Sequence, residues 1–319
     1  MLRIGIVGTN FISDRLLDAV KKTDGVIVTA VYSRTEERGR EFAARHGISA
    51  VYTDLRAFAA SHEIDAAYIA SPNLFHGEQS LLLLQNKKHV LCEKPLAKDL
   101  NECIRAKAAA EENGCVYLEA MRPVFTPTFE KLREYLGEIG KIRSVQLGFS
   151  QYSSRYDRFL RGEVLNAFNP ALANAALMDI GVYPIEVLIS LFGLPLSFES
   201  HSHFLSNGFE GAGHILAVYD GFHASIAYSK IHNSSLPSVI EGEAGSVMIN
   251  KMNSFDTVTL KTSAREERFT DTEENNMVYE LTAFREMTEK KRDAAPYLEA
   301  SLSTVRFLDA VREKNGIVF

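Results

Sequence analysis

The 319-residue sequence contains no tryptophan and only three cysteines, Cys92, Cys103 and Cys115. An odd number of cysteines without CxxC spacing favours reduced thiols, and therefore a cytoplasmic protein. No apolar run approaches the roughly 18 residues that span a bilayer, and the N-terminal residues lack the pattern of a signal peptide. The formal net charge of −6 gives no basic footprint. We therefore expect neither a nucleic acid nor a membrane as a partner.

The nine histidines do not form a recognisable metal motif. His201 and His203 would share one face of a strand, but no third ligand follows at a spacing typical of zinc sites. The sequence therefore predicts no metal site.

Residues 1–120 alternate between short β-rich runs and longer helical patterns, which predicts a doubly wound parallel sheet. The expected strands are rich in Val, Ile and Leu, as is typical where helices cover both faces of a sheet. Gly25, Gly47 and Gly114 stand where helices should end in left-handed caps. Strands are expected at residues 2–7, 26–32, 66–70, 88–92 and 116–119, and helices at residues 13–23, 35–45, 54–61, 77–85 and 101–113.

Residues 121–319 follow a different pattern, which predicts an α+β domain with an open, mostly antiparallel sheet. A helix over residues 125–136 leads into an extended stretch over residues 141–152 and a long helix around residues 171–192. Asp220-Gly221 separates two β-rich runs and predicts a hairpin with a type I′ turn. Further strands are expected at residues 238–241, 246–250 and 257–261, and closing helices at residues 276–291 and 296–312.

A glycine-containing turn joins the first expected strand to the first helix. A pyrophosphate needs close backbone approach and free N–H groups at a helix N-terminus, and glycine permits both. Asn10 stands where the second glycine of the GxGxxG fingerprint is usual, and we expect it in the left-handed region, which asparagine tolerates. The alternative is an ordinary turn without a ligand. The residues expected at the pyrophosphate are Gly8, Thr9, Asn10, Phe11 and Ile12.

The second strand ends at Ser33-Arg34, where an Asp or Glu usually contacts the free ribose 2′-OH of NAD. A hydroxyl and a guanidinium suit a 2′-phosphate instead, so the sequence favours NADP, with NAD remaining possible. The alternative is that Arg34 stacks on adenine or caps the following helix.

Three further segments carry candidate ligand-binding groups. Two of them follow successive strands, at the sheet edge where ligands bind in open α/β folds. They are Ser71-Pro72-Asn73 with His76, and Glu93-Lys94-Pro95. In the third segment Asp179 and Tyr183 are four positions apart, so on a helical turn they face the same side. There a carboxylate can orient a phenol. The alternatives are a solvated Lys94 and a tyrosine that only packs in the core.

Together these motifs resemble the glucose–fructose oxidoreductase / inositol dehydrogenase (Gfo/Idh/MocA) family along nearly the whole chain. The resemblance implies a Rossmann domain, a substrate domain on an open sheet, and a last helix that packs back on the Rossmann domain. It implies that Lys94 bonds the reacting oxygen, that Pro95, Asn73 and His76 lie near the nicotinamide end, and that Asp179 orients the acid/base residue. That residue is often histidine, whereas Tyr183 is similar to the dimeric dihydrodiol dehydrogenase branch.

These expectations describe an oxidoreductase that transfers hydride between a nicotinamide cofactor and a hydroxyl-bearing carbon of a sugar, polyol or trans-diol. A homodimer or higher homo-oligomer is expected from the resemblance. Residues 173–176, Ala-Asn-Ala-Ala, replace a glycine-rich run of many relatives, and we expect their side chains to crowd the mouth of the pocket. The alternatives are a non-catalytic dinucleotide sensor and a glycoside-cleaving enzyme that keeps its NAD bound.

Overall fold

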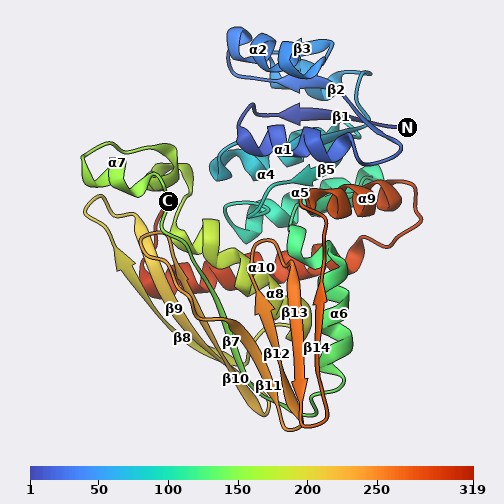
Figure 1. The fold of residues 1–319 in the computed structure, drawn as a ribbon. Coiled ribbons are helices and arrows are strands. Elements are labelled where there is room, and N and C mark those ends of the chain that lie inside the picture. The colour runs from blue at the N-terminus through green and yellow to red at the C-terminus, as the bar shows by residue number, and fades with distance from the viewer. The chain divides into compact units, whose positions relative to one another are not determined.

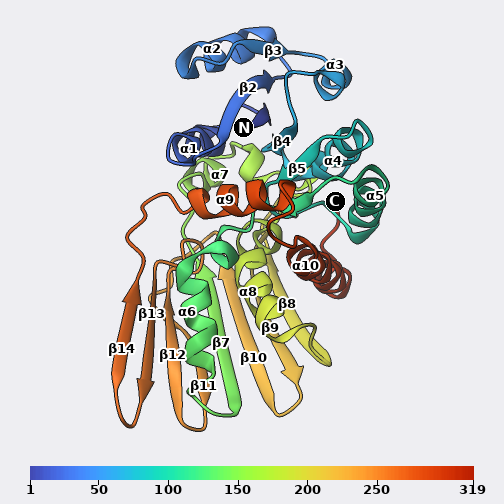
Figure 2. The same ribbon diagram turned by 90° about the vertical axis from the view of Figure 1, so that its right-hand side faces the viewer.

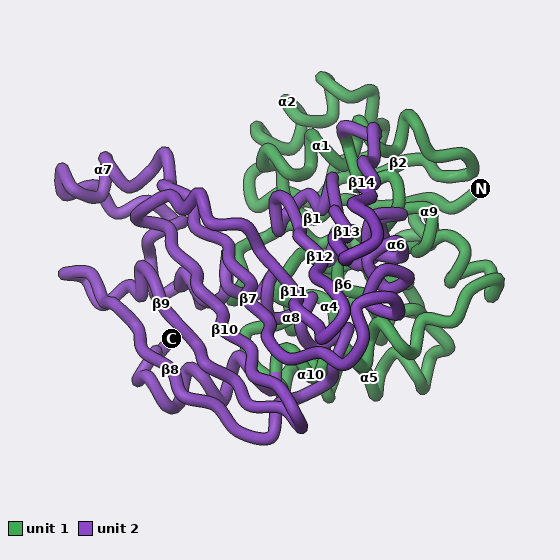
Figure 3. Tube along the Cα trace, turned by 60° about the horizontal axis from the view of Figure 1, so that its bottom comes forward, with its two compact units in different colours: residues 1–120, 275–305 green, residues 121–274, 306–319 purple.

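A computed structural model describes all 319 residues, and the chain divides into two compact units (Figure 3). Unit 1 comprises residues 1–120 and 275–305, and unit 2 comprises residues 121–274 and 306–319. The break after residue 120 falls where the sequence pattern changes, whereas residues 275–305 return to unit 1. No helix has the length and apolar composition that crossing a membrane requires.

Unit 1 is built on a six-stranded parallel sheet with the order β3-β2-β1-β4-β5-β6 (Figure 1). This is the strand order of the Rossmann fold, with its crevice at the point where the order reverses between β1 and β4. The strands are β1 (Leu2–Val7), β2 (Val26–Tyr32), β3 (Ala50–Tyr52), β4 (Ala66–Ile69), β5 (His89–Cys92) and β6 (Tyr117–Glu119).

Helices cover this sheet, and their ends follow the sequence signals. Gly47 and Gly114 are left-handed C-caps with φ of 70° and 64°, as predicted, whereas Gly25 has φ of 76° but lies beyond the end of α1, whose C-cap is Lys21 in the right-handed region. The short edge strand β3 was not predicted, because three residues are too few for a periodic signal. The helices are α1 (Phe11–Val20), α2 (Glu36–His46), α3 (Leu55–Ala60), α4 (His76–Gln85), α5 (Leu100–Asn113) and α9 (Met277–Thr288), with the 3₁₀ turn η1 (Asn73–Phe75).

Residues 275–305 pack on the core of unit 1, although they follow the whole of the eight-stranded sheet in the sequence. The Asn275 side chain donates to the carbonyl of Arg15 over 2.9 Å, and α9 packs on α1. The long closing helix α10 (Ala295–Asn315) begins in unit 1, where Leu302 and Val305 belong to the same buried cluster as β4 and β5.

Unit 2 is built on an eight-stranded open sheet with the order β14-β13-β12-β11-β7-β10-β9-β8. All neighbouring strands are antiparallel except β7 and β10, so the predicted α+β class is confirmed. The strands are β7 (Ile142–Ser150), β8 (Ser197–Phe204), β9 (Glu210–Tyr219), β10 (Phe222–Ser229), β11 (Ser238–Gly242), β12 (Gly245–Asn250), β13 (Thr257–Thr262) and β14 (Glu266–Thr270).

Helices α6 (Pro127–Leu136) and α8 (Val182–Phe192) cover one face of this sheet (Figure 2). Side chains alternate along the strands, as expected for a sheet with one covered face. Leu216, Val218 and Met248 are exposed. The last residues of α10 also belong to unit 2, where Phe307 packs on Phe198 with ring centroids 4.9 Å apart.

Two sequence predictions in unit 2 were wrong. The region 171–192 is not one helix: a 3₁₀ turn η4 (Pro170–Leu172) ends at Ala173 with φ of 55°, and a π-helical turn η5 (Leu177–Gly181) precedes α8. Residues 171–192 are mostly apolar, and an apolar run of this kind occurs both in buried helices and in buried turns. Hydrophobic periodicity therefore could not distinguish the two structures. The hairpin at Asp220-Gly221 exists, but only Gly221 has positive φ, whereas a type I′ turn needs it at both residues.

Candidate active site

The turn between β1 and α1 lies so close to the end of the neighbouring strand β4 that Gly8 has no room for a side chain. Gly8 has φ of 107°, and a Cβ there would lie 2.9 Å from the carbonyl oxygen of Ala70. Its N–H donates to the carbonyl of Tyr32 over 3.1 Å. The backbone of Gly8 and Thr9 therefore lies at the β1/β4 crevice, as the pyrophosphate prediction requires.

Asn10 does not adopt the predicted left-handed conformation. It is the N-cap of α1 in the extended region, with φ of −95°, and its Oδ1 accepts from the N–H of Ile12 over 3.0 Å. Its Nδ2 donates to the carbonyl of Ala70 over 2.6 Å. The earlier residue Gly8 provides the positive φ of the turn, so Asn10 is free to act as a cap. Phe11, the exposed first residue of α1, leaves its N–H for an anion at the positive end of the helix dipole.

The two residues predicted at the 2′-phosphate differ in exposure. Ser33 is buried, with its N–H bonded to the carbonyl of Tyr52 over 3.0 Å. Arg34 is exposed and forms no ion pair within the chain. Arg34 is therefore the more accessible residue of this pair.

His76, predicted beside the cofactor, is a buried link between two loops. Its Nδ1 lies 2.8 Å from the carbonyl oxygen of Pro95, and its Nε2 lies 2.8 Å from that of Ser71. Burial lowers the pKa of His76, and the two carbonyl contacts act in the opposite direction. The ring thus holds the turn of Ser71, Pro72 and Asn73 against the loop after β5.

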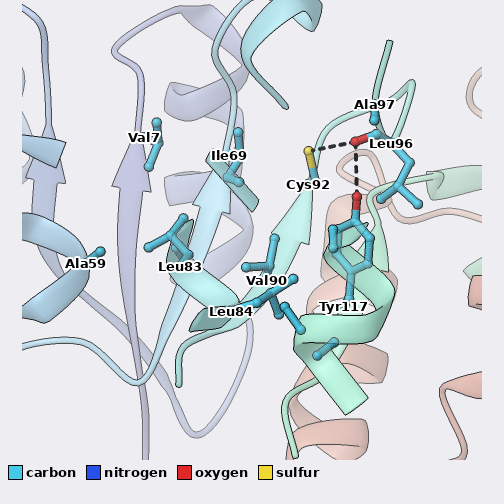
Figure 4. Close-up of a cluster of buried hydrophobic side chains, with 14 of the residues drawn as sticks. Val7, Ala59, Ile69, Leu83, Leu84, Val90, Cys92, Leu96, Ala97 and Tyr117 are labelled. Carbon is cyan, nitrogen blue, oxygen red and sulfur yellow. Dashed lines mark hydrogen bonds between the residues drawn. The ribbon is translucent and has the colours of Figure 1, made fainter. Parts of the chain in front are cut away.

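The loop Glu93-Lys94-Pro95 after β5 is held by hydrogen bonds from side chains of β4, β5 and β6. The Glu93 carboxylate accepts from the Tyr68 hydroxyl over 2.6 Å, and the carbonyl of Leu96 accepts from the Tyr117 hydroxyl over 3.4 Å and from Cys92 Sγ (Figure 4). Burial raises the pKa of the Cys92 thiol, consistent with a packing role. Lys94 itself is half-buried, on a loop that these contacts hold in place.

Asp179 lies on the π-helical turn η5 of unit 2. Such turns insert an extra residue into a helix and are frequent at functional sites. The carboxylate of Glu210 on β9 accepts from the N–H of Leu177, the first residue of η5, over 2.8 Å. Burial raises the pKa of Glu210 to about 7. A buried acid from a distant strand therefore holds the start of the turn that carries Asp179.

Tyr183 is buried at the start of α8, directly after η5. Its hydroxyl oxygen accepts from Arg122 Nη2 over 2.9 Å, and its ring meets that of Phe149 edge-on, with centroids 5.6 Å apart. Because arginine has no acceptor, this contact leaves the phenol hydrogen available for a different partner. Tyr183 is thus a phenol held by a buried cation.

Asp179 is paired with Lys230, which directly follows β10. Lys230 Nζ lies 2.7 Å from Asp179 Oδ2. Neither Lys230 nor Arg122 was predicted, because neither stands in a motif: the sheet register brings Lys230 to η5, and Arg122 comes from a 3₁₀ turn, Arg122–Phe125, that packs near α8. Each residue of the predicted Asp179/Tyr183 pair therefore has a basic partner in unit 2.

Residues 173–176, expected at the mouth of the pocket, are mostly shielded from solvent. Ala173, Ala175 and Ala176 are fully buried, and Asn174 donates to the carbonyl of Asn166 over 3.2 Å. The three alanine methyl groups are therefore not exposed at the surface. No group of three or more His, Cys, Asp or Glu side chains is arranged to share a metal ion.

A Rossmann unit joined to an open-sheet unit, with a lysine loop and an Asp/Tyr pair, defines the class of nicotinamide-dependent oxidoreductases. Residues 2–121 match the family described as oxidoreductase family, NAD-binding Rossmann fold, and residues 129–248 match the GFO/IDH/MocA C-terminal domain. The chain belongs to the GFO/IDH/MocA family and is an NAD(P)-dependent oxidoreductase.

Two relatives align over the whole chain. The chain is 40% identical to scyllo-inositol 2-dehydrogenase (NADP(+)) IolU of Bacillus subtilis (strain 168), with 100% of this chain and 98% of the relative covered. It is 26% identical to trans-1,2-dihydrobenzene-1,2-diol dehydrogenase of Mus musculus, with the same coverage. Among solved structures, the 3-ketoreductase KijD10 of Actinomadura kijaniata with NADP and TDP-benzene has a TM-score of 0.87 and 25% identity, with 98% of each chain covered.

Proposed function

We propose that this enzyme transfers hydride between NADP and a hydroxyl-bearing carbon of a cyclic polyol, a sugar or a trans-diol. The observation that carries the proposal is the Asp179/Tyr183 pair in unit 2, in which each residue is held by a cation. The IolU and mouse dehydrogenase relatives act on an inositol and a cyclic trans-diol, which supports this substrate class.

Unit 1 is the proposed binding site of the dinucleotide. The groups at the β1/β4 crevice suit a pyrophosphate: a glycine where a Cβ would collide, and a helix N-terminus whose first N–H has no acceptor in the chain. When bound, the nicotinamide supplies the hydride donor or acceptor. The proposed contacts are made by Gly8, Thr9, Asn10, Phe11, Ile12, Ser33, Arg34, Ser71, Pro72, Asn73, Glu93, Lys94 and Pro95, while His76 holds two of these segments together.

Proton transfer is assigned to Tyr183, and charge stabilisation to Lys94. During oxidation the phenolate form of Tyr183 accepts the proton of the substrate hydroxyl and becomes the phenol, and during reduction the phenol gives that proton to the alkoxide and becomes the phenolate again. Lys94 stabilises the negative charge that develops on that oxygen. Asp179 orients the substrate hydroxyl or Tyr183.

The preference for NADP is tested by Arg34→Ala. Loss of one charge-assisted contact with the 2′-phosphate should weaken NADP(H) by about 1.5–3 kcal/mol and leave NAD(H) nearly unchanged. The matched control is Arg38→Ala, an exposed arginine further along the same segment. Equal losses for both cofactors in a binding titration would remove Arg34 from the phosphate.

The function itself is tested by screening inositols, aldoses and trans-diols with NADP and NAD, read as NADPH or NADH absorbance. Turnover that depends on a vicinal ring diol supports the proposal. A protein that binds the cofactor but turns over no member of the screen would instead act as a sensor. We further propose a cytoplasmic enzyme, consistent with three free cysteines, and a homo-oligomer that uses the uncovered sheet face.

A further inference from the structure

Lys230 is an almost fully buried lysine that the reaction described above does not use. Its Nζ lies 2.7 Å from Asp179 Oδ2 and donates to the carbonyl of Ala167 over 2.7 Å. The same atom lies over the rings of Phe168 and Phe209, 5.0 and 5.3 Å from their centroids. The ammonium is thus surrounded by a carboxylate, a carbonyl and two aromatic faces.

Stability alone does not account for a lysine at this position. Removing an ammonium from water costs several kcal/mol, and apolar replacements of buried ion pairs are often neutral or stabilising. Apolar residues in place of both Lys230 and Asp179 would fill the space beside Phe168 and Phe209 without that cost. The charge of Lys230 therefore calls for another role.

The two partners of the ion pair differ in exposure, which indicates that role. Only 3% of the Lys230 side chain is exposed, against 37% of the Asp179 side chain. The lysine is the inner partner and the carboxylate is the outer one. A ligand at the surface of unit 2 can reach Asp179 but not Lys230.

We propose that Lys230 is a positioning residue for the reaction. Its ammonium holds one oxygen of Asp179 in place and compensates the carboxylate charge, so that Asp179 is presented to the substrate in one orientation. This assignment rests on the proposed function, in which Asp179 acts on the proton-transfer group.

The same ammonium also connects Asp179 to the segment around α7 (Tyr156–Leu160). Phe168 stacks on Tyr156 and on Phe159, each with ring centroids 5.6 Å apart. The carbonyl of Ala167 and the ring of Phe168 both contact Lys230. This aromatic segment therefore fixes Lys230, and through it Asp179.

The test is a kinetic comparison of Lys230→Met with the wild-type enzyme on a substrate from the screen. We expect kcat to fall roughly 10²-fold, the scale of a misplaced catalytic group, while KM and NADP(H) affinity change little. The acid limb of the kcat profile should move to higher pH, because protonation of Asp179 is no longer opposed by a neighbouring ammonium. The unfolding midpoint should also fall, because methionine fills the space but leaves the Asp179 carboxylate and the carbonyl of Ala167 without their partner, so the loss of kcat is compared at a temperature where both proteins are folded.

Two variants complete the design. Lys230→Arg keeps the charge and should retain more activity than Lys230→Met. Lys88→Met is the matched control: Lys88 Nζ in unit 1 donates only to the carbonyls of Ser61 and Ile64, so its loss should leave the kinetics unchanged. If Lys230→Met does not fold, Lys230→Gln, which keeps one donor for Ala167, replaces it.

The outcomes separate this proposal from the proposed function. Near-wild-type kcat and an unshifted pH profile in a folded, neutral Lys230 variant overturn the positioning role while the enzyme remains a dehydrogenase. An Arg variant no more active than the Met variant also overturns it. A wild-type protein without turnover on any polyol, sugar or diol overturns the proposed function and this assignment with it.

Discussion

The candidate residues of unit 1 and unit 2 are held in place by different kinds of contact. In unit 1 the lysine loop is fixed by contacts to its backbone: His76 lies against the carbonyls of Ser71 and Pro95, and Tyr117 donates to that of Leu96. In unit 2 the candidates are fixed through their own side chains, by Arg122 on Tyr183 and by Lys230 on Asp179.

This difference has a consequence for what mutations do. A loop fixed through its backbone should keep its shape when the half-buried side chain of Lys94 is replaced, so this change should alter the chemistry more than the stability. A side chain held by a buried cation cannot be replaced without leaving that cation short of a partner. Variants in unit 2 should therefore combine kinetic and stability effects, and variants in unit 1 should separate them.

The largest effect is expected for Lys94→Met. It should lower kcat/KM by roughly 10²–10⁴, the scale of a positioned proton-transfer or charge-stabilising group, with cofactor affinity and unfolding nearly unchanged. Steady-state kinetics and a cofactor titration measure this. Lys98→Met, which removes an ammonium paired with Glu102, is the control and should stay active. Near-wild-type turnover of the Lys94 variant would remove it from the mechanism.

Tyr183→Phe should show a kinetic loss of similar size together with a stability loss. The phenylalanine keeps the ring contact with Phe149 but removes the oxygen that accepts from the buried Arg122, which should cost about 1–3 kcal/mol. Combined with Lys94→Met, the kinetic loss should be less than the sum, because the two groups act as a unit. Full additivity in the double mutant would show that they do not serve one reacting oxygen.

Glu210→Gln should change how the stability of the protein depends on pH. Burial raises the pKa of Glu210 from 4.5 to about 7. Between these values the folded protein keeps a proton that the unfolded chain has released, so the free energy of unfolding falls as pH rises through this window and levels off above it.

The glutamine variant has no ionisable group at this position, so its free energy of unfolding should not fall in this pH window for that reason. Its amide oxygen can still accept from the N–H of Leu177. Its stability relative to wild type should rise by on the order of 3 kcal/mol from pH 4 to pH 8, measured by denaturant unfolding. A difference that does not depend on pH would show that Glu210 ionises as it does in water.

The sequence predicted unit 1 more fully than unit 2 for a physical reason. Gly8, the Glu93-Lys94-Pro95 loop and the Ser71-Pro72-Asn73 turn each follow a strand, and the ends of parallel strands meet at one sheet edge, so order along the chain predicts proximity in space. Arg122, Glu210 and Lys230 come from three separate elements. Only the register of β9 and β10 brings Glu210 and Lys230 to η5, and a single sequence does not specify that register.

Local conformation was also harder to predict than the fold. The fingerprint at Gly8 correctly indicated a tight turn, but the positive φ lies at Gly8 itself, and Asn10 is extended. The π-helical turn at Asp179 has no periodic signal of its own. Asp179 and Tyr183 could be selected from their spacing, whereas the turn that carries Asp179 and the cations that hold both residues could not.

The smallest effect concerns Asn10, and it tests the corrected conformation of the phosphate turn. As an extended N-cap, Asn10 contributes through its side chain, so Asn10→Ala should cost about 1 kcal/mol of stability, the usual value of a cap. Asn10→Val should cost a similar amount, because extended backbone does not strain a β-branched residue. Asn10→Ser, which can still cap α1 but cannot donate an amide hydrogen to Ala70, should lie between them and wild type. Chemical denaturation and an NADP titration of the three variants measure this. A valine variant far less stable than the alanine variant would mean that the position has positive φ after all, and equal stability of the serine and alanine variants would show that the cap is not what Asn10 contributes.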